Sequence, residues 1–235
     1  MGGDTPKQFL PLAGKPVLMH TVALFRDALP NARIVVSLPG EQIGYWEELC
    51  RRHSFVVPLS VVKGGPTRYL SVSNALEACG ECDYIAIHDG VRPLASVQMI
   101  RRTLEEAAMH GNAVPAVQPN DSFRLVEEES SRTLEKEDSP SFDREDLRPI
   151  GRSTPVDRAA LRAVQTPQIF AADIIRRAYT MQPEGQFTDD ATVVEQLGIK
   201  IHLCAGEENN IKITRALDMT IAEAVLKNRN KSGHL

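Results

Sequence analysis

The sequence lacks any apolar run near the roughly 18 residues that a membrane span needs, and it does not open on a basic segment followed by an apolar one. It is also poor in cysteine, with four in 235 residues. Cys79 and Cys82 form one isolated Cys-x-x-Cys pair, without the second cysteine or histidine pair of a zinc site. We therefore expect a cytoplasmic protein with free thiols and no membrane partner.

Neither sign of charge dominates the chain. The formal net charge is -4 and the pI is about 5.9, so nucleic acid is not an expected partner. No Gly-x-Gly-x-x-Gly follows a predicted strand, which argues against a dinucleotide-dependent dehydrogenase. A chain of this length is long enough for one α/β domain with a sizeable core. We expect a single domain with one appendage.

Short β-branched runs alternate with longer amphipathic stretches along the chain. This alternation predicts an α/β fold with a doubly wound, mostly parallel sheet. Strands are predicted at 34–38, 59–62, 84–87, 113–117 and 199–203. Helices are predicted at 16–29, 42–53, 67–79, 97–110, 171–180, 188–197 and 215–228. Pro16 is expected in a first helical turn, and Thr188 and Thr214 are expected as N-caps.

One segment, at about 126–152, breaks the alternation because it is charged and has few apolar residues. Such a segment does not bury enough surface to join a core. Two interpretations remain open for it. One is a disordered surface insertion, and the other is an extended arm whose flanking strands pair with a second subunit.

The most useful polar groups follow predicted strands. Ligands of open parallel sheets bind outside the carboxyl ends of the strands, so these positions are candidate site residues. After the strand ending at Val62 come Gly64 and Gly65, then Arg68 and Ser71 on one face of a predicted helix. Paired glycines allow close approach of a ligand, and the helix N-terminus offers N–H groups to an anion. A plain turn is the alternative.

Asp89 and Gly90 follow the strand at 84–87. An aspartate at a strand end is well placed to hold Mg²⁺ through one carboxylate. A simple Asp-Gly turn would explain both residues but gives no reason for the nearby Arg92. Lys212 precedes a predicted helix, where it would add positive charge to an anion site, although a lone lysine is usually surface decoration.

Three further segments are individually weak candidates, because each is as well explained by solvated charge. They are Pro6-Lys7-Gln8, Asp121-Ser122-Phe123-Arg124 and Asp157-Arg158. Taken with Gln165-Thr166-Pro167-Gln168, Thr188-Asp189-Asp190 and the strand-end loops, their order and spacing resemble the 2-C-methyl-D-erythritol 4-phosphate cytidylyltransferase family. The resemblance covers nearly the whole chain.

The resemblance implies a nucleotidyltransferase domain over 1–235, with a protruding β-arm at 119–160 that makes a homodimer. It implies Mg²⁺, and the substrates CTP and a polyol phosphate, 2-C-methyl-D-erythritol 4-phosphate, for isoprenoid precursor synthesis. The substrate's phosphate oxygen would attack the α-phosphorus of CTP, and pyrophosphate would leave. A phosphate monoester is largely ionised at neutral pH, so no general base is obligatory.

Residue roles follow from the same resemblance. The catalytic residues would be Lys7, Lys212 and Arg158. The two lysines would hold the phosphates of CTP, and Arg158 would reach the other subunit's site. The cytidine contacts would come from Arg68, Ser71 and Gly90, with Gly64 and Gly65 in the adjoining loop. Asp89 would bind the metal and lie near both substrates. The polyol phosphate would be seated by Ser122, Thr166 and Thr188.

Two departures from the family pattern stand out. The family begins with a strand and an Ala-Ala-Gly-x-Gly-x-Arg-Met loop around the triphosphate, and this chain begins at the methionine that ends that motif. We expect a gap in the middle of the sheet as a result, and we hypothesise a start assigned too far downstream or a truncated chain. The second departure is Pro66, where the family often carries an acidic residue.

Two alternative functions remain open at this point. A sister enzyme that transfers CMP to ribitol 5-phosphate shares the fold, the loops and the lysines. An inactive nucleotide-binding dimer is supported by the missing N-terminal loop alone.

Overall fold

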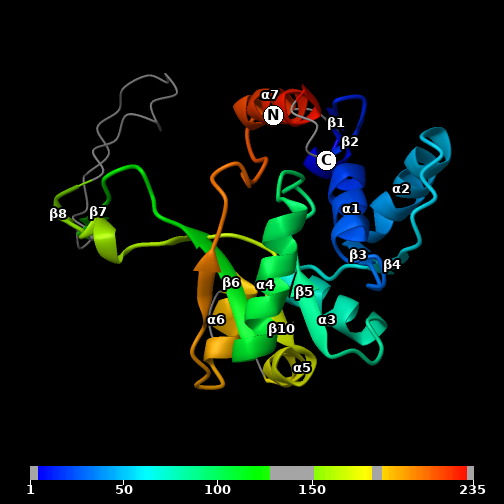
Figure 1. Ribbon diagram of the computed structural model, residues 1–235. Coiled ribbons are helices and arrows are strands. Elements are labelled where there is room, and N and C mark those ends of the chain that lie inside the picture. The colour runs from blue at the N-terminus through cyan, green and yellow to red at the C-terminus, as the bar shows by residue number, and fades with distance from the viewer. Residues whose placement is uncertain (1–4, 128–150, 182–186, 232–235) are drawn as a thin grey trace, which may run out of the picture. The chain divides into compact units, whose positions relative to one another are not determined.

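The computed structural model describes residues 5–127, 151–181 and 187–231. The chain divides into two compact units, one of Met1–Val117 with Val164–Leu235 and one of Gln118–Ala163. The first unit carries the alternating helices and strands, and the second carries a short hairpin (Figure 1). Among the described residues, no helix is both long and apolar enough to cross a membrane.

The helices lie close to their predicted ranges. They are α1 (Val17–Ala28), α2 (Gly40–Arg52), α3 (Arg68–Ala78), α4 (Val97–His110), α5 (Ala172–Thr180), α6 (Asp190–Glu195) and α7 (Ala216–Lys231), with short 3₁₀ turns η1 (Lys7–Phe9) and η3 (Arg158–Ala160). The bounds of α4 are those predicted. It begins where Ser96 accepts a hydrogen bond from the Met99 N–H and ends at Gly111, whose φ of 80° is left-handed.

Three predictions about helix starts were wrong in detail. Pro16 lies at the N-cap position of α1, one residue before its first turn. Asp189, and not Thr188, caps α6, and its carboxylate accepts the Thr192 N–H. At the start of α7 the Thr214 hydroxyl donates to Asp218, and the Asp218 carboxylate also accepts the backbone N–H groups of Thr214 and Arg215.

Six strands of the first unit form the two sheets that matter for the site. They are β3 (Val35–Leu38), β4 (Ser60–Lys63), β5 (Tyr84–Ile87), β6 (Asn112–Val117), β10 (Gln168–Ala171) and β11 (Leu203–Ala205). β11 pairs with β6 in parallel, and β10 runs antiparallel between β6 and β5. β5, β6 and β11 therefore share one direction, which confirms the predicted mostly parallel α/β fold. The remaining short strands are β1 (Pro11–Leu12), β2 (Lys15–Pro16) and β9 (Ala163–Val164).

The parallel pair β3–β4 forms a sheet of its own. Among the described strands, none bridges this pair to the four-strand path β11–β6–β10–β5.

The last predicted strand was misplaced. It was expected at 199–203 but starts only at Leu203. The side chain of Asn112 donates to the Lys200 carbonyl and accepts the His202 N–H, so this amide takes the place of a strand ladder. Ile199 and Ile201 satisfy the apolar pattern by packing on the core from an irregular segment. The antiparallel strand β10 was not predicted.

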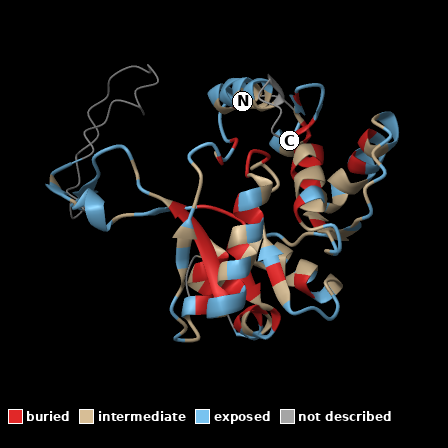
Figure 2. Cartoon of the chain, in the orientation of Figure 1, coloured by how far each residue is buried: buried red, intermediate tan, exposed pale blue. Residues whose placement is uncertain are grey.

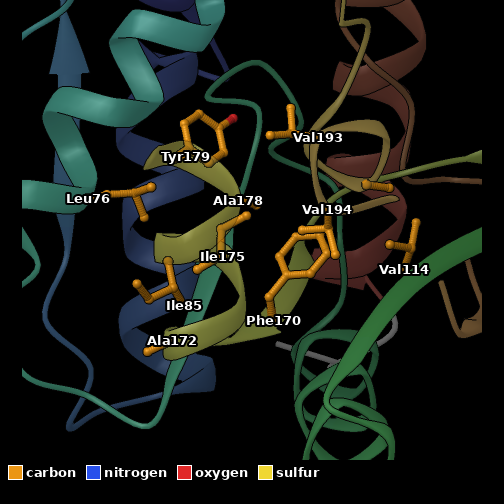
Figure 3. Close-up of a cluster of buried hydrophobic side chains, with 11 residues drawn as sticks. Leu76, Ile85, Val114, Phe170, Ala172, Ile175, Ala178, Tyr179, Val193 and Val194 are labelled. Atoms are coloured by element: carbon orange, nitrogen blue, oxygen red, sulfur yellow. The ribbon is translucent and has the colours of Figure 1, made fainter. Parts of the chain in front are cut away.

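The largest buried cluster lies between β10, α5 and α6 (Figure 3). Phe170 projects from β10 toward Val194 of α6, and Ile175 of α5 lies beside Ile85 of β5. Figure 2 shows buried residues concentrated along β6 and on the inner faces of the helices. A second cluster, around Trp46, joins α1 and α2 to β3. These clusters fix the carboxyl ends of the strands, from which the site is built.

The second unit contains one antiparallel hairpin. β7 (Arg124–Val126) pairs with β8 (Ser153–Pro155), with Leu125 opposite Thr154. Most of the segment predicted as an insertion or arm, residues 128–150, lies outside the described residues.

Candidate functional site

Asp89, just beyond the end of β5, is the centre of a cluster of charges. Its Oδ2 lies 3.1 Å from Lys212 Nζ and accepts a hydrogen bond from Arg92 Nε at 3.2 Å. The Asp89 side chain is 17% exposed and that of Lys212 is 47% exposed. Asp89 and Lys212, which are separated by more than a hundred positions, therefore meet at one strand end.

The carboxylate of Asp89 is held in its charged form. Burial alone would raise its pKa, but Lys212, and then Arg92, outweigh that effect and lower the pKa below the ordinary value. In the described part of the chain no hydrogen bond uses Oδ1 of this group. An ionised carboxylate with a free oxygen, open to solvent on one side, fits a hard cation such as Mg²⁺.

The loop that carries Lys212 is fastened to the loop that carries Asp89. The guanidinium of Arg92 donates to the Asn210 carbonyl at 2.7 Å, and the Ile213 N–H donates to the Val91 carbonyl at 2.9 Å. Asn210 is fully buried, and its amide donates to the carbonyl of Thr166 at 2.9 Å. The ammonium group of Lys212 is thus positioned by backbone contacts on both sides.

His88 lies behind Asp89 and is kept neutral. Burial lowers its pKa to about 4. Its Nε2 lies 3.0 Å from the Arg92 carbonyl, and its Nδ1 lies 2.9 Å from Thr166 Oγ1. A carbonyl only accepts, so Nε2 carries the proton and Nδ1 accepts the Thr166 hydroxyl. Thr166 Oγ1 in turn accepts the Asp89 N–H at 3.1 Å, which fixes the backbone under the carboxylate.

The low pKa of His88 predicts a loss of stability in acid. The unfolded chain, with a histidine pKa of 6.5, binds more protons than the folded protein between about pH 6.5 and pH 4. The contribution of His88 is complete above pH 6.5 and is lost as the pH falls through this window, by up to about 3 kcal/mol. Urea unfolding at a series of pH values should show that the unfolding free energy falls less steeply with falling pH for His88→Asn than for the wild type.

His53, at the end of α2, provides the matched control, because His53→Asn removes a histidine outside this network. The wild-type slope should persist in that variant. An unchanged slope in His88→Asn would contradict the neutral, buried state of His88.

The glycine loop before α3 is closed by Ser71. Its Oγ accepts the Gly65 N–H at 3.1 Å and lies 2.9 Å from the Thr67 carbonyl. A Cβ on Gly65 would come within 2.4 Å of Leu70 Cβ, and one on Gly64 within 3.0 Å of Ser71 Oγ. Position 65 therefore requires glycine, and a side chain at position 64 would press on the Ser71 hydroxyl. The tight turn directs the N-terminus of α3 toward the carboxyl ends of β3 and β4.

Arg68 is held by a fully buried carboxylate from α6. Its guanidinium makes a two-pronged contact with Asp190, whose Oδ1 also accepts the Tyr179 hydroxyl at 2.6 Å. Burial would lower the pKa of Arg68, but Asp190 outweighs it and raises the pKa. The charge on Asp89 also contributes to that rise. This contact joins α3 to α6 and fixes the direction of the Arg68 side chain.

The other predicted site residues are less constrained. Lys7 is exposed in η1, and its side chain has no hydrogen bond or ion pair with the described residues. The Gly90 carbonyl accepts the Thr21 hydroxyl at 2.9 Å, and Thr188 is exposed just before α6. Ser122 and Arg158 belong to the second unit, where Arg158 donates to the Asn120 carbonyl at 2.6 Å.

Sequence reasoning did not assign three residues that shape the site. Arg92 and Asn210 fasten the two loops, and Asp190 fixes Arg68. Arg92 and Asp190 lay next to or within motifs that had been singled out. An arginine three residues after Asp89 was a usable signal, whereas the pairing of Arg68 with Asp190 spans 122 positions and depends on the fold.

Comparison with known proteins points in one direction. Residues 1–149 and 150–228 match the family described as 2-C-methyl-D-erythritol 4-phosphate cytidylyltransferase. A protein of that name from Bacteroides thetaiotaomicron is 38% identical over 226 residues, which cover 96% of this chain and 93% of the relative. One from Clostridium perfringens is 33% identical over 230 residues, covering 97% of this chain and 93% of the relative.

Solved structures agree with these relatives. The crystal structure of 2-C-methyl-D-erythritol 4-phosphate cytidylyltransferase from Thermus thermophilus has a TM-score of 0.71 and 31% identity, and the match covers 94% of each chain. A structure titled 4-diphosphocytidyl-2C-methyl-D-erythritol synthase has a TM-score of 0.73 and 26% identity, with 94% of this chain and 95% of the other covered.

Proposed function

Because the chain belongs to the 2-C-methyl-D-erythritol 4-phosphate cytidylyltransferase family, we propose that it transfers CMP from CTP to 2-C-methyl-D-erythritol 4-phosphate at the Asp89 site, releasing pyrophosphate. It is a nucleotidyltransferase of isoprenoid biosynthesis. The observation that supports this location is the ion pair between Asp89 and Lys212, formed where the carboxyl end of β5 meets the loop after β11.

The reaction brings two anions together. An oxygen of the substrate phosphate attacks the α-phosphorus of CTP, and the bond to the leaving pyrophosphate breaks. Negative charge then shifts to the equatorial and leaving oxygens, where fixed cations stabilise it most. Lys212 supplies such a cation from a loop that is held before substrate binds. Lys7 is proposed to add a second ammonium group from η1.

Mg²⁺ is proposed as the divalent cation, with Asp89 as its protein ligand through the free Oδ1. When bound, the ion would neutralise part of the triphosphate charge. Lys212 and Arg92 keep the Asp89 carboxylate ionised, and Thr166 fixes its backbone, so these residues prepare the ligand.

The remaining roles extend this proposal. Arg68, Ser71 and Gly90, together with Gly64 and Gly65, are assigned to the cytidine part of CTP, and Ser122, Thr166 and Thr188 to the polyol phosphate. The support is strongest for Arg68 and the glycine loop, whose conformations are fixed by Asp190 and Ser71. The hydroxyl of Thr166 is committed to His88 and Asp89, which favours a supporting role at that end of the site.

We also propose a cytoplasmic homodimer formed through the arm at 119–160, from which Arg158 would reach the partner's site. The hairpin of the second unit exposes apolar side chains, among them Leu125 at 65% exposure. Exposed apolar side chains on a short hairpin are typical of an interface. Sedimentation equilibrium of the full chain, and of Leu125→Glu, tests this assembly. A wild-type monomer would contradict it.

The function is tested by turnover. Purified protein with Mg²⁺ and CTP should release pyrophosphate in the presence of 2-C-methyl-D-erythritol 4-phosphate, and far more slowly with ribitol 5-phosphate. Preference for ribitol 5-phosphate would favour the sister activity, which the family match does not favour. CTP binding without turnover of either polyol would support an inactive binding protein.

A further inference from the structure

A cluster of metal-ligating side chains lies outside the site described above. Glu106 and His110, one helical turn apart on α4, meet His202 from the segment that leads into β11. Asp89 follows the carboxyl end of β5, whereas His202 precedes the amino end of β11, which is parallel to β5 in direction. The two groups therefore occupy opposite ends of the strands.

The geometry of the cluster is that of a ligand set. Glu106 Oε2 lies 3.0 Å from His202 Nε2 and 3.5 Å from His110 Nε2. In a tetrahedral site with metal–ligand distances of about 2.0–2.1 Å, neighbouring ligand atoms are about 3.3 Å apart. The two observed distances bracket this value. Ligand atoms of all three residues lie within 4.8 Å of one another.

The positions are also prepared by buried structure. The backbone of His202 is held on both sides. Its N–H donates to Asn112 Oδ1 at 2.8 Å, and the His202 carbonyl accepts the Val114 N–H at 2.9 Å. His110 is the last residue of α4, directly before the left-handed Gly111. The side chains of Glu106, His110 and His202 are 28%, 44% and 35% exposed, which leaves room for an ion and a water ligand.

Glu106 pairs with both histidines, with His202 through a hydrogen bond and with His110 as an i,i+4 neighbour on α4. The two imidazole rings are stacked with centroids 3.7 Å apart, and both direct Nε2 to the same carboxylate oxygen. Two imidazoles and one carboxylate suit Zn²⁺ or a related first-row transition ion, and they do not suit Mg²⁺ or Ca²⁺, which prefer oxygen ligands.

We propose that Glu106, His110 and His202 form a transition-metal site that ties the end of α4 to the entry of β11. Each histidine would present the lone pair of Nε2 with its proton on Nδ1, and water would fill the fourth position. Binding at this site would stabilise the folded protein, because the unfolded chain does not hold the three ligands together.

The test is titration of the full chain with Zn²⁺, with excess Mg²⁺ present to occupy oxygen sites. The wild type should bind one Zn²⁺, and its melting temperature should rise. His110→Gln and His202→Gln should each weaken binding at least about tenfold. His53→Gln, which removes a histidine from α2, should leave it unchanged. Equal binding in all variants, or no binding at about 100 µM Zn²⁺, overturns the proposal.

X-ray absorption at the zinc edge of the wild type provides a measurement that needs no variant. The expected shell contains only nitrogen and oxygen, with the outer-shell signature of two imidazoles. Sulfur in the shell would assign the ion to cysteine and overturn the proposal. Neither result depends on cytidylyltransferase activity.

Discussion

Replacing Lys212 by methionine should lower kcat/KM for the cytidylyl transfer by about 10²–10³ while leaving the protein folded. The ammonium group lies 3.1 Å from Asp89 and is proposed to meet charge that develops on the phosphates. Methionine keeps the length of the side chain and removes the charge. Initial rates at saturating Mg²⁺, with each substrate varied in turn, measure the effect.

Lys200→Met is the matched control, because Lys200 is an exposed lysine that also precedes α7 in the sequence and lies outside the Asp89 site. It should retain wild-type rates. Since Lys212 is half exposed, its ion pair should contribute less than about 1 kcal/mol to stability, so urea midpoints should hardly differ. A Lys212→Met enzyme within a few-fold of the wild type would remove the basis for the proposed site.

Replacing Asp190 by asparagine should cost about 3 kcal/mol of unfolding free energy. Asp190 is fully buried and accepts hydrogen bonds from Arg68 and Tyr179, so the neutral side chain leaves a half-buried cation without its counter-charge. The cost falls at the lower end of the range for broken buried pairs, because Arg68 reaches solvent. Urea unfolding measures it.

Asp190 acts through another residue, so its variant should also raise KM for CTP more than it lowers kcat. Glu195→Gln, at the exposed end of the same helix, should change neither quantity. Asp190→Asn with wild-type stability and wild-type KM would mean that Arg68 needs no counter-charge for its position.

The sequence predicted those helices and strands that are long enough to show an apolar repeat or that are bounded by residues typical of element ends. The helix α4 has the bounds that were predicted, and the residues at its ends, Ser96 and Gly111, are of the types that favour helix starts and stops. β5 was found because its four residues are apolar and bounded by Asp83 and His88. β10 was missed because its direction is decided by its two neighbours in the sheet, and no local pattern records a neighbour.

The candidate site residues were chosen one by one from the sequence, and their contacts were not predicted. Asp89 and Lys212 were chosen from their places after strands, and the structure pairs them. The contact of Arg68 with Asp190 could not be predicted, because it requires knowing that the first residue of α3 lies against the first residue of α6. The contacts of Asn112 could not be predicted either. Its side chain binds the backbone of Lys200 and His202, where the apolar pattern predicted a strand.

The fastening of the loop at Asn210 to the loop at Asp89 has a kinetic consequence. Because Arg92, Asn210 and Thr166 already hold the two backbones together, Lys212 in its proposed role needs no ordering of its loop when the nucleotide binds. The loop loses its conformational entropy during folding, so substrate binding does not have to order it again in each catalytic cycle.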